Sequence, residues 1–432
     1  MDLDRAFSPA THINLNIRGM RQSATVAIND LSKAMAKEGR EVFKLGLGQS
    51  PFPVPDIMTQ ALQENAFQKD YLMVKGLPEL RQSIVDYYER TQGLDYNADH
   101  VLVGPGSKEL MFILQLTYYG DLVIPAPSWV SYAPQARIIG RKLHWLPTAI
   151  ETGLGVTPDE LEKLCQTDPD LPRLMILNYP GNPTGMTYSE DQLKEIAEVA
   201  KKYRVLILSD EIYGGVTFSG NHVSIARFYP EGTIISNGIS KWAGAGGWRL
   251  GAFVFPENLS WLLEPMTSVA SETFTSTSAP IQFAAIKAYE QSVEMDSYLD
   301  NCREILAALC THTWRELSAI GVEVAEPKGG FYLFPNFEPL RAVIEAKGIT
   351  NSMQMCERLL ADTGVACLPG SVFGRPDNEF SVRIACVDFD GDDALHAIAR
   401  GNSVDGEFLD IYCYPVVEAT RRICQWLTQD HD

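Results

Sequence analysis

The sequence predicts an α/β fold, with a large domain built on a mainly parallel sheet flanked by helices and a smaller α+β domain. Two observations support this. Short runs rich in Val, Ile and Leu alternate with helical stretches for most of the 432 residues. After about residue 290 this rhythm changes. A chain of this length, 45% hydrophobic and 21% charged, is large enough for more than one core.

The expected strands of the large domain are short apolar runs bounded by Gly, Pro or polar residues, as in buried parallel strands. They lie at 100–103, 122–124, 174–177, 205–208, 233–236 and 250–255. A helix is expected over 189–203, because a capping box starting at Ser189 precedes an apolar stripe. Pro78 and Pro158 each sit where the first turn of a helix is expected.

The second domain is expected to begin with a long helix near 296–319. Strands at 330–334, 365–368 and 380–385 follow, around a helix near 350–362. The sequence therefore predicts a large domain over 48–292, and a small domain made of 1–47 and 293–432.

The C-terminal part of the small domain forms an acidic extension. Residues 387–432 hold 10 Asp or Glu and three Arg. Interleaved apolar residues such as Phe408 and Trp426 favour an ordered, docked segment over a disordered tail. A solvated acidic face is the favoured interpretation, and a partner-binding tail is the alternative.

Charge and composition exclude several classes of protein. The net charge of −19 argues against a broad electrostatic hold on nucleic acid or on an anionic membrane surface. No run reaches the ~18 apolar residues that a membrane span requires, and the N-terminus lacks an export signal. Eight scattered cysteines show no CxxC pair and no metal-ligand spacing. We therefore expect a cytoplasmic protein with reduced thiols and no metal.

A first candidate site is the turn GPGSKE (104–109), which lies between an expected strand and an expected helix. Free N–H groups and the helix dipole make such a turn an anion site, suited to a phosphate. A nicotinamide-dinucleotide site is the alternative, but Glu109 stands where that fingerprint has its third glycine.

A more specific signal is an ordered set of four motifs, each after an expected strand. They are NYPGNPTG (178–185), SDEIY (209–213), SK (240–241) and GWR (247–249). At the carboxyl ends of strands in an open α/β sheet, these side chains would converge on one crevice.

This set resembles the class I/II pyridoxal-phosphate-dependent aminotransferases, which have the aspartate aminotransferase-like fold (fold type I), and its spelling is most similar to the prokaryotic branch. The resemblance extends over about 24–385. Further motifs that carry it are SATVA (23–27), LGLG (45–48), YLMVKG (71–76), PSWVSY (127–132), GGFY (329–332), PG (369–370) with FG (373–374), and VR (382–383).

The resemblance implies pyridoxal 5'-phosphate as the cofactor and roles for the central motif residues. Lys241 would form the Schiff base with the cofactor aldehyde and move the proton of the substrate, and Ser240 beside it would contact the cofactor. Asp210 would pair with the pyridine nitrogen. Tyr213 and Asn182 would hydrogen-bond the phenolic oxygen and so lower the pKa of the Schiff base.

The same resemblance assigns the two ends of the cofactor. The phosphate would be held by Arg249, Ser107, Lys108 and the N–H of Gly106, where a guanidinium fork suits phosphate geometry. Trp129 would stack on the cofactor ring.

Substrate and partner contacts are also implied. Arg383 would clamp the α-carboxylate of the substrate, and Gly48 would let its backbone approach the same group, with Trp129 and Asn182 nearby. Tyr71 in this family reaches the phosphate of the neighbouring subunit, which implies a homodimer with shared active sites.

Two departures from the family pattern bear on specificity. The segment 266–279 contains no Arg or Lys, whereas one branch of aspartate-specific relatives uses an Arg from the partner subunit to hold the distal carboxylate. Gly244, Ala245 and Gly246 stand where relatives commonly carry Ala-Met-Thr, and we expect this floor of small residues to leave more room or more mobility beside the cofactor.

The expected activity is transfer of an amino group from an L-amino acid to a 2-oxo acid. The enzymatic alternative is another reaction at Cα or Cβ, such as β-elimination, decarboxylation or cyclisation in specialised biosynthesis, because one fold hosts several chemistries. The non-enzymatic alternative is a regulatory protein that binds the cofactor without turnover.

Overall fold

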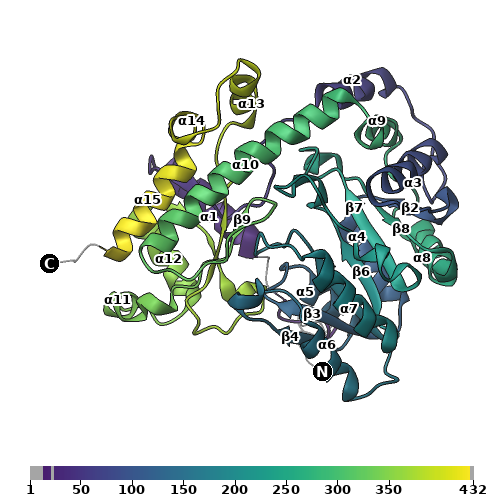
Figure 1. Cartoon of the computed structure of the whole chain (residues 1–432), viewed down its shortest axis with the longest axis horizontal. Helices are drawn as coiled ribbons and strands as arrows, with labels where there is room; N and C mark the ends of the chain where they lie inside the picture. The colour runs from purple at the N-terminus through teal and green to yellow at the C-terminus, as the bar shows by residue number, and fades with distance from the viewer. Residues whose placement is uncertain (1–12, 21–23, 429–432) are drawn as a thin grey trace, which may run out of the picture.

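The computed structural model describes residues 13–20 and 24–428. Ser23, the first residue of one motif quoted above, lies outside the described residues. Figure 1 shows a larger part built around a twisted sheet and a smaller part, with the long helix α10 (Val293–Ala319) running between them. Short strands in the smaller part come from both ends of the chain.

The sheet of the larger part has seven strands in the order β2-β8-β7-β6-β5-β3-β4. Only β8 runs antiparallel to its neighbours, so the sheet is mainly parallel, as predicted. The strands are β2 (Val101–Gly104), β3 (Asp121–Ala126), β4 (Leu143–Pro147), β5 (Arg173–Asn178), β6 (Leu206–Asp210), β7 (Thr233–Gly238) and β8 (Gly251–Val254).

The edge strand β4 is the one that the sequence analysis missed. Leu143 and His144 are half-buried, Trp145 and Pro147 are exposed, and only Leu146 is buried. A strand at the edge of a sheet does not need the continuous apolar run by which the buried strands were recognised.

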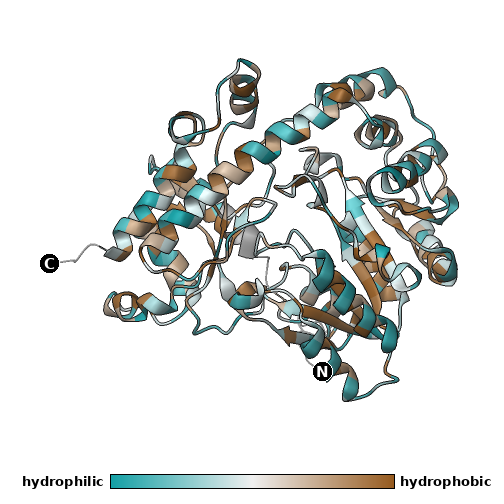
Figure 2. Ribbon diagram, in the orientation of Figure 1, coloured by the Kyte–Doolittle hydropathy of each residue, from teal (hydrophilic) through white to brown (hydrophobic). Residues whose placement is uncertain are grey.

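Helices cover both faces of this sheet, whose strands are largely apolar in Figure 2. They are α2 (Asp56–Asn65), α3 (Pro78–Gln92), α4 (Ser107–Thr117), α5 (Tyr132–Ile139), α6 (Pro158–Gln166), α7 (Glu190–Lys202), α8 (Ser260–Thr273) and α9 (Ala279–Tyr289). Successive strand residues enter different cores: Leu174 and Ile176 pack with α4 and α8, whereas Met175 and Leu177 pack with α6 and α7.

Local signals at the helix ends agree with the sequence. The Ser189 hydroxyl accepts a hydrogen bond from the Gln192 backbone N–H, and the Gln192 side chain accepts one from the Ser189 backbone, so the capping box is confirmed. Pro78 and Pro158 each occupy the first helical turn, where a missing N–H costs little.

The smaller part contains two small sheets, with β1 pairing parallel to β10, and β11-β12-β9 antiparallel. The strands are β1 (Phe43–Lys44), β9 (Tyr332–Leu333), β10 (Val365–Ala366), β11 (Leu368–Pro369) and β12 (Val382–Ala385). The helices are α1 (Ala24–Lys37), α11 (Arg341–Ala346), α12 (Ser352–Thr363), α13 (Gly391–Ala399), α14 (Gly406–Tyr412) and α15 (Tyr414–Thr428).

The acidic C-terminal segment is ordered and docked, as predicted. Helix α15 packs along α10 and α12, and its buried Glu418 forms ion pairs with Arg421 and Arg422. Near the start of the same segment, the ring of Phe389 packs edge to face against that of Phe52, with centroids 5.8 Å apart. As far as Thr428, where the described residues end, the extension is therefore part of the folded body, because apolar residues such as Phe408 and Trp426 are buried.

Three further features follow from the described residues. All eight cysteines are free thiols, and seven are buried. None of the helices described is long and apolar enough to cross a membrane. Within the same residues, no group of three or more His, Cys, Asp or Glu side chains could hold a metal ion.

Candidate active site

A pocket of about 520 Å³ opens at the carboxyl ends of the parallel strands, beside the smaller part of the molecule. In such a sheet, the side chains that follow neighbouring strands meet at this edge. The residues that line it are Leu47, Gly48, Gln49, Ser107, Lys108, Trp129, Tyr132, Asn178, Asn182, Asp210, Ile212, Tyr213, Ser240, Lys241, Gly246, Gly247, Arg249, Tyr332 and Arg383. The four ordered motifs of the sequence are therefore brought to one site.

Asp210, the last residue of β6, is 2% exposed. Its Oδ2 accepts a hydrogen bond of 2.5 Å from the Tyr132 hydroxyl, and Ser236 lies at 3.4 Å from its Oδ1. Burial raises the pKa of this carboxyl to about 6, although the Tyr132 hydrogen bond opposes that shift. No ion pair is found for it in the described part of the chain, and its side-chain partners are the two hydroxyls just named, so the buried carboxylate suits a cationic ring nitrogen placed in the pocket.

Lys241 extends into the same pocket, and its Nζ donates a hydrogen bond of 2.5 Å to the backbone oxygen of Gly48. Burial, and after it the nearby cations Arg383, Arg249 and Lys108, together lower the pKa of this ammonium to about 8. An amine with such a pKa is partly unprotonated near neutrality and can act as a nucleophile or as a base.

One end of the pocket is built for an anion. Gly106, with φ of 94°, is the residue before α4, and no side chain caps the first N–H groups of that helix. The Arg249 guanidinium lies against Gly106, where a Cβ would collide with it. Arg249 itself has φ of 56° and donates 2.9 Å to the Gly246 oxygen. With Ser107 and Lys108 also lining the pocket, these donors fit a phosphate group.

Lys108 has a second contact that bears on the site. Its Nζ lies 4.8 Å from the centroid of the Trp129 ring, a cation–π distance. Burial and the nearby Arg249 charge both lower the pKa of the Lys108 ammonium. Trp129 therefore faces the pocket from beside the anion end.

The other end holds Arg383, which is 2% exposed and belongs to β12. Its Nη1 donates to the side-chain oxygen of Asn182 at 3.1 Å, and its Nη2 donates to the Gly46 backbone oxygen at 2.6 Å. Its Nε has no hydrogen-bond partner. Its acceptors are thus neutral oxygens, and no ion pair is found for it among the described residues, so this buried guanidinium is suited to binding a carboxylate.

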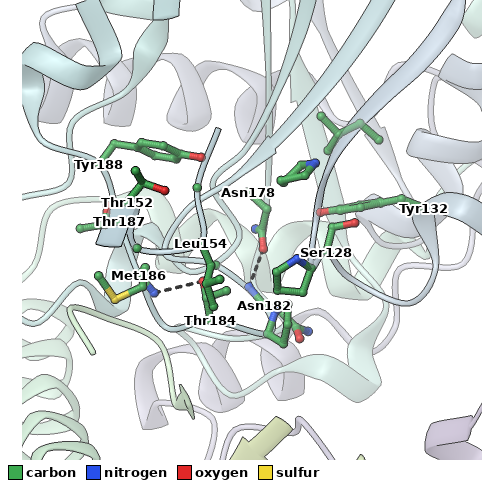
Figure 3. Close-up of a pocket in the computed structure, with 17 residues that line it drawn as sticks. Ser128, Tyr132, Thr152, Leu154, Asn178, Asn182, Thr184, Met186, Thr187 and Tyr188 are labelled. Carbon is green, nitrogen blue, oxygen red and sulfur yellow. Dashed lines mark hydrogen bonds between the residues drawn. The ribbon is translucent and has the colours of Figure 1, made fainter. Parts of the chain in front are cut away.

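Asn182 is held by the chain that follows β5. The Asn178 side-chain oxygen accepts a hydrogen bond of 2.7 Å from the Asn182 backbone N–H, and the Asn178 amide donates 2.8 Å to the Asp210 backbone oxygen. Behind this turn is a second cavity of about 30 Å³, lined by residues including Ser128 and Thr184 (Figure 3). It has room for about one or two waters, not for a cofactor.

Among the pocket residues that the sequence analysis did not single out, two tyrosines make contacts that bear on the site. Tyr132 holds Asp210, and the Tyr332 hydroxyl lies 2.9 Å from the Tyr213 hydroxyl. Both stand in motifs quoted above, PSWVSY and GGFY, so the motifs were the available signal. The hydrogen bond that each hydroxyl makes could not be predicted from the motif alone.

Two expectations need comment. Tyr71 is 89% exposed and does not line the pocket of its own chain, which is compatible with a contact to a second subunit. The expected extra room at Gly244 is wrong: the backbone oxygens of Phe52 and Pro53 occupy the space of its missing Cβ. At Gly246 an added Cβ would meet the Ser240 backbone oxygen at 3.3 Å, and at Gly247 it would meet nothing within 4 Å.

The chain was compared with known proteins. The family model "Aminotransferase class I and II" matches residues 40–400. An aspartate aminotransferase of Geobacillus stearothermophilus is 34% identical over 84% of this chain and 92% of its own. An asparagine–oxo-acid transaminase of Streptococcus mutans is 31% identical over 85% and 93%.

A solved structure of Thermus thermophilus aspartate aminotransferase with maleate superposes with a TM-score of 0.81. It is 25% identical, and the match covers 96% of this chain and 99% of that one. The expected fold is thus confirmed. Pyridoxal phosphate is the cofactor of this family, and the pocket offers groups that fit its phosphate, its ring nitrogen and its aldehyde. By its sequence, its fold and its pocket, the chain belongs to the class I and II aminotransferases and is a pyridoxal-phosphate-dependent transaminase.

Proposed function

We propose that this aminotransferase holds its cofactor through Lys241, and that the amine of Lys241, once free, carries the proton from Cα of the amino acid. Bound pyridoxal phosphate supplies an aldehyde that condenses with amines and a ring that withdraws electrons from Cα. The observation that carries the proposal is that Lys241 and Asp210 line one pocket with their pKa values shifted toward each other, to about 8 and about 6.

The remaining cofactor contacts follow from the same pocket. Asp210, held by Tyr132, is proposed to keep the ring nitrogen protonated, because a buried carboxylate without a cation favours one. Tyr213 is proposed to donate its hydroxyl to the phenolic oxygen, with Asn182 beside it. Trp129 is proposed to cover the ring.

The anion end is proposed to bind the phosphate. Arg249, Ser107, Lys108 and the backbone N–H of Gly106 supply its donors, and Ser240 lies next to Lys241 in the pocket lining. Both the charge of Arg249 and the free N–H groups of α4 favour an anion there.

For the substrate, we propose that Arg383 grips the α-carboxylate and that Gly48 approaches the same group. Arg383 lines the pocket as a buried guanidinium, and none of the ion pairs found among the described residues involves it, which supports this. Aspartate is the donor to test first, since the relatives include enzymes named for aspartate and asparagine. Four cations line the pocket (Lys108, Lys241, Arg249 and Arg383), which suits an anionic cofactor and an anionic substrate.

We further propose that residues 48–292 form the cofactor-binding domain, and that 1–47 and 293–432 form the small domain. Of the pocket residues, only Leu47, Tyr332 and Arg383 come from the second set. A cytoplasmic location is proposed from the reduced state of the cysteines.

A homodimer with shared sites is proposed from the surface around Tyr71. Phe67, Tyr71 and Met73 are exposed to 74%, 89% and 58%, and such neighbouring apolar side chains favour a protein interface. Hybrid dimers test this. Mixing Tyr71→Ala and Lys241→Ala chains, each weak alone, should restore part of the activity if each site takes Tyr71 from the partner. No gain over either parent would contradict shared sites.

The test of the activity itself is the half-reaction. Purified protein with pyridoxal phosphate is mixed with each common amino acid, without an oxo acid, and its absorption spectrum is recorded. Conversion of the yellow cofactor to the pyridoxamine form, with one equivalent of 2-oxo acid released, supports transamination and identifies the donors. Release of ammonia or carbon dioxide would instead favour β-elimination or decarboxylation.

A further inference from the structure

The hydroxyls of Tyr213 and Tyr332 form a pair at the floor of the pocket. Their oxygens are 2.9 Å apart, and the two side chains are 2% and 1% exposed. The rings meet edge to face with centroids 5.6 Å apart. Tyr213 follows β6 in the large domain, whereas Tyr332 begins β9 in the small domain. The hydrogen bond therefore joins the two domains beside the cofactor pocket.

The backbone around Tyr332 keeps its hydroxyl in this place. A Cβ on Gly48 would collide with the Tyr332 hydroxyl, and a Cβ on Gly185 would collide with the Tyr332 backbone oxygen. In the ladder between β9 and β12, Tyr332 pairs with Ala385. Two of the motif glycines are thus required at their positions, because any side chain there would collide with this tyrosine.

The charges around the pair indicate which hydroxyl donates. The Arg383 guanidinium lies 4.7 Å from the centroid of the Tyr332 ring and, after burial has raised the pKa of Tyr332, is the strongest influence that lowers it. Burial raises the pKa of Tyr213 well above its ordinary value. The neighbouring Tyr332 hydroxyl raises it further, and so does Asp210, whereas Arg383 opposes the shift. The more acidic phenol is the better donor.

We propose that Tyr332 is a positioning residue that donates its hydroxyl proton to the Tyr213 oxygen, so that the Tyr213 proton points at the phenolic oxygen of the cofactor. The proposal rests on the role proposed above for Tyr213. Because a phenol has one proton, an acceptor contact from Tyr332 leaves Tyr213 free to donate elsewhere. A hydroxyl that accepts one hydrogen bond also becomes a stronger donor of the next.

Through the two hydroxyls, Tyr332 would therefore influence the acidity of the bound cofactor. A donor at the phenolic oxygen withdraws charge and lowers the pKa at which the bound cofactor changes its absorption. Tyr332 shares its small sheet with Arg383, the proposed clamp for the substrate carboxylate. The residue proposed to tune the cofactor and the residue proposed to bind the substrate therefore lie on two paired strands, β9 and β12.

The experiment is a pH titration of the absorption band of the bound cofactor in the holoenzyme. Tyr332→Phe keeps the ring and removes the hydroxyl. We expect the titration midpoint to rise by about half a unit to one unit, and Tyr213→Phe to raise it more, because a direct contact is lost. Tyr332→Phe with Tyr213→Phe should titrate like Tyr213→Phe alone, since Tyr332 acts through Tyr213.

The matched control is Tyr289→Phe, because the Tyr289 hydroxyl is buried and has no hydrogen-bond partner. Its midpoint should stay at the wild-type value. If Tyr213→Phe shifts the midpoint but Tyr332→Phe does not, or if the two shifts add in the double variant, the role of Tyr332 is wrong while that of Tyr213 stands. If Tyr213→Phe itself leaves the midpoint unchanged, both roles are wrong.

Discussion

The guanidinium of Arg383 donates a hydrogen bond of 3.1 Å to the side-chain oxygen of Asn182, across 201 positions of sequence. Arg383 belongs to the small sheet and Asn182 to the turn after β5, so this contact fixes the proposed substrate clamp to the cofactor side of the pocket. The second donor of Arg383, to the Gly46 oxygen, ties in the N-terminal segment.

Replacing Arg383 with Lys should lower kcat/KM for substrates that have an α-carboxylate. Lys lacks the planar fork that makes both contacts, and losing a charge-assisted hydrogen bond costs ~1.5–3 kcal/mol, roughly a 10- to 100-fold effect. Steady-state kinetics with several amino donors measures this. Arg341→Lys, on the surface of the same domain, is the control and should stay near wild type. An unchanged kcat/KM for Arg383→Lys would contradict the clamp.

Capture of pyridoxal phosphate by the apoprotein should accelerate as the pH rises through about 8. Burial and three nearby cations lower the pKa of Lys241 to about 8 from its ordinary 10.5, so above that pH the amine is unprotonated and nucleophilic. Stopped-flow absorbance gives the rate at each pH. Lys241→Ala should show no such absorption change at any pH. A rate midpoint near 10.5 would contradict the depressed pKa.

Asp210→Asn should stabilise the apoprotein at pH 7 while abolishing activity. Burial raises the pKa of Asp210 from 3.8 to about 6, so the folded state holds more protons than the unfolded state between these values. Stability from this group is therefore present at pH 4 and falls as the pH rises through 6, by about 3 kcal/mol.

Urea unfolding of wild-type and Asp210→Asn apoprotein at pH 4 and pH 7 checks this. The variant should gain stability relative to wild type at pH 7 but not at pH 4. Asp95→Asn, at an exposed position, is the control and should change stability little at either pH. If the variant is no more stable than wild type at pH 7, the buried carboxylate does not destabilise the apoprotein and the prediction is wrong.

Gly244→Ala should destabilise the protein by ~1–3 kcal/mol. The backbone of Gly244 has φ of +65°, and an added Cβ would lie 2.6 Å from the Phe52 oxygen. Gly247→Ala, three residues on in the same loop, meets nothing within 4 Å and should be nearly neutral. Chemical denaturation of the two variants compares them directly. Equal stabilities of the two variants would mean that residues 52–53 move aside with no loss of stability, which would contradict the prediction.

The arrangement of the large domain was readable from the sequence because its strands are buried on both faces. Such strands are continuous apolar runs, and six of the seven were found that way, including β5 and β7. The edge strand β4 has one buried residue and gave no such run. In the small domain, β9 is two residues long, shorter than the run at 330–334 that predicted it.

The sequence also predicted which candidate residues would lie together. Lys241, Asp210, Tyr213, Asn182 and Arg383 all line one pocket. This was predictable because each motif follows a strand, and parallel strands end at one edge. Their roles toward the cofactor stay proposals that the experiments above address.

Local patterns and motif order were enough to predict the fold, the family and most of the residues at the pocket. How those residues act on one another became visible only in the folded chain: the hydroxyl pair of Tyr332 and Tyr213, the filled space beside Gly244, and the shifted pKa values of Lys241 and Asp210. Each depends on burial and on distances between segments far apart in the chain, and neither quantity is written in a local pattern.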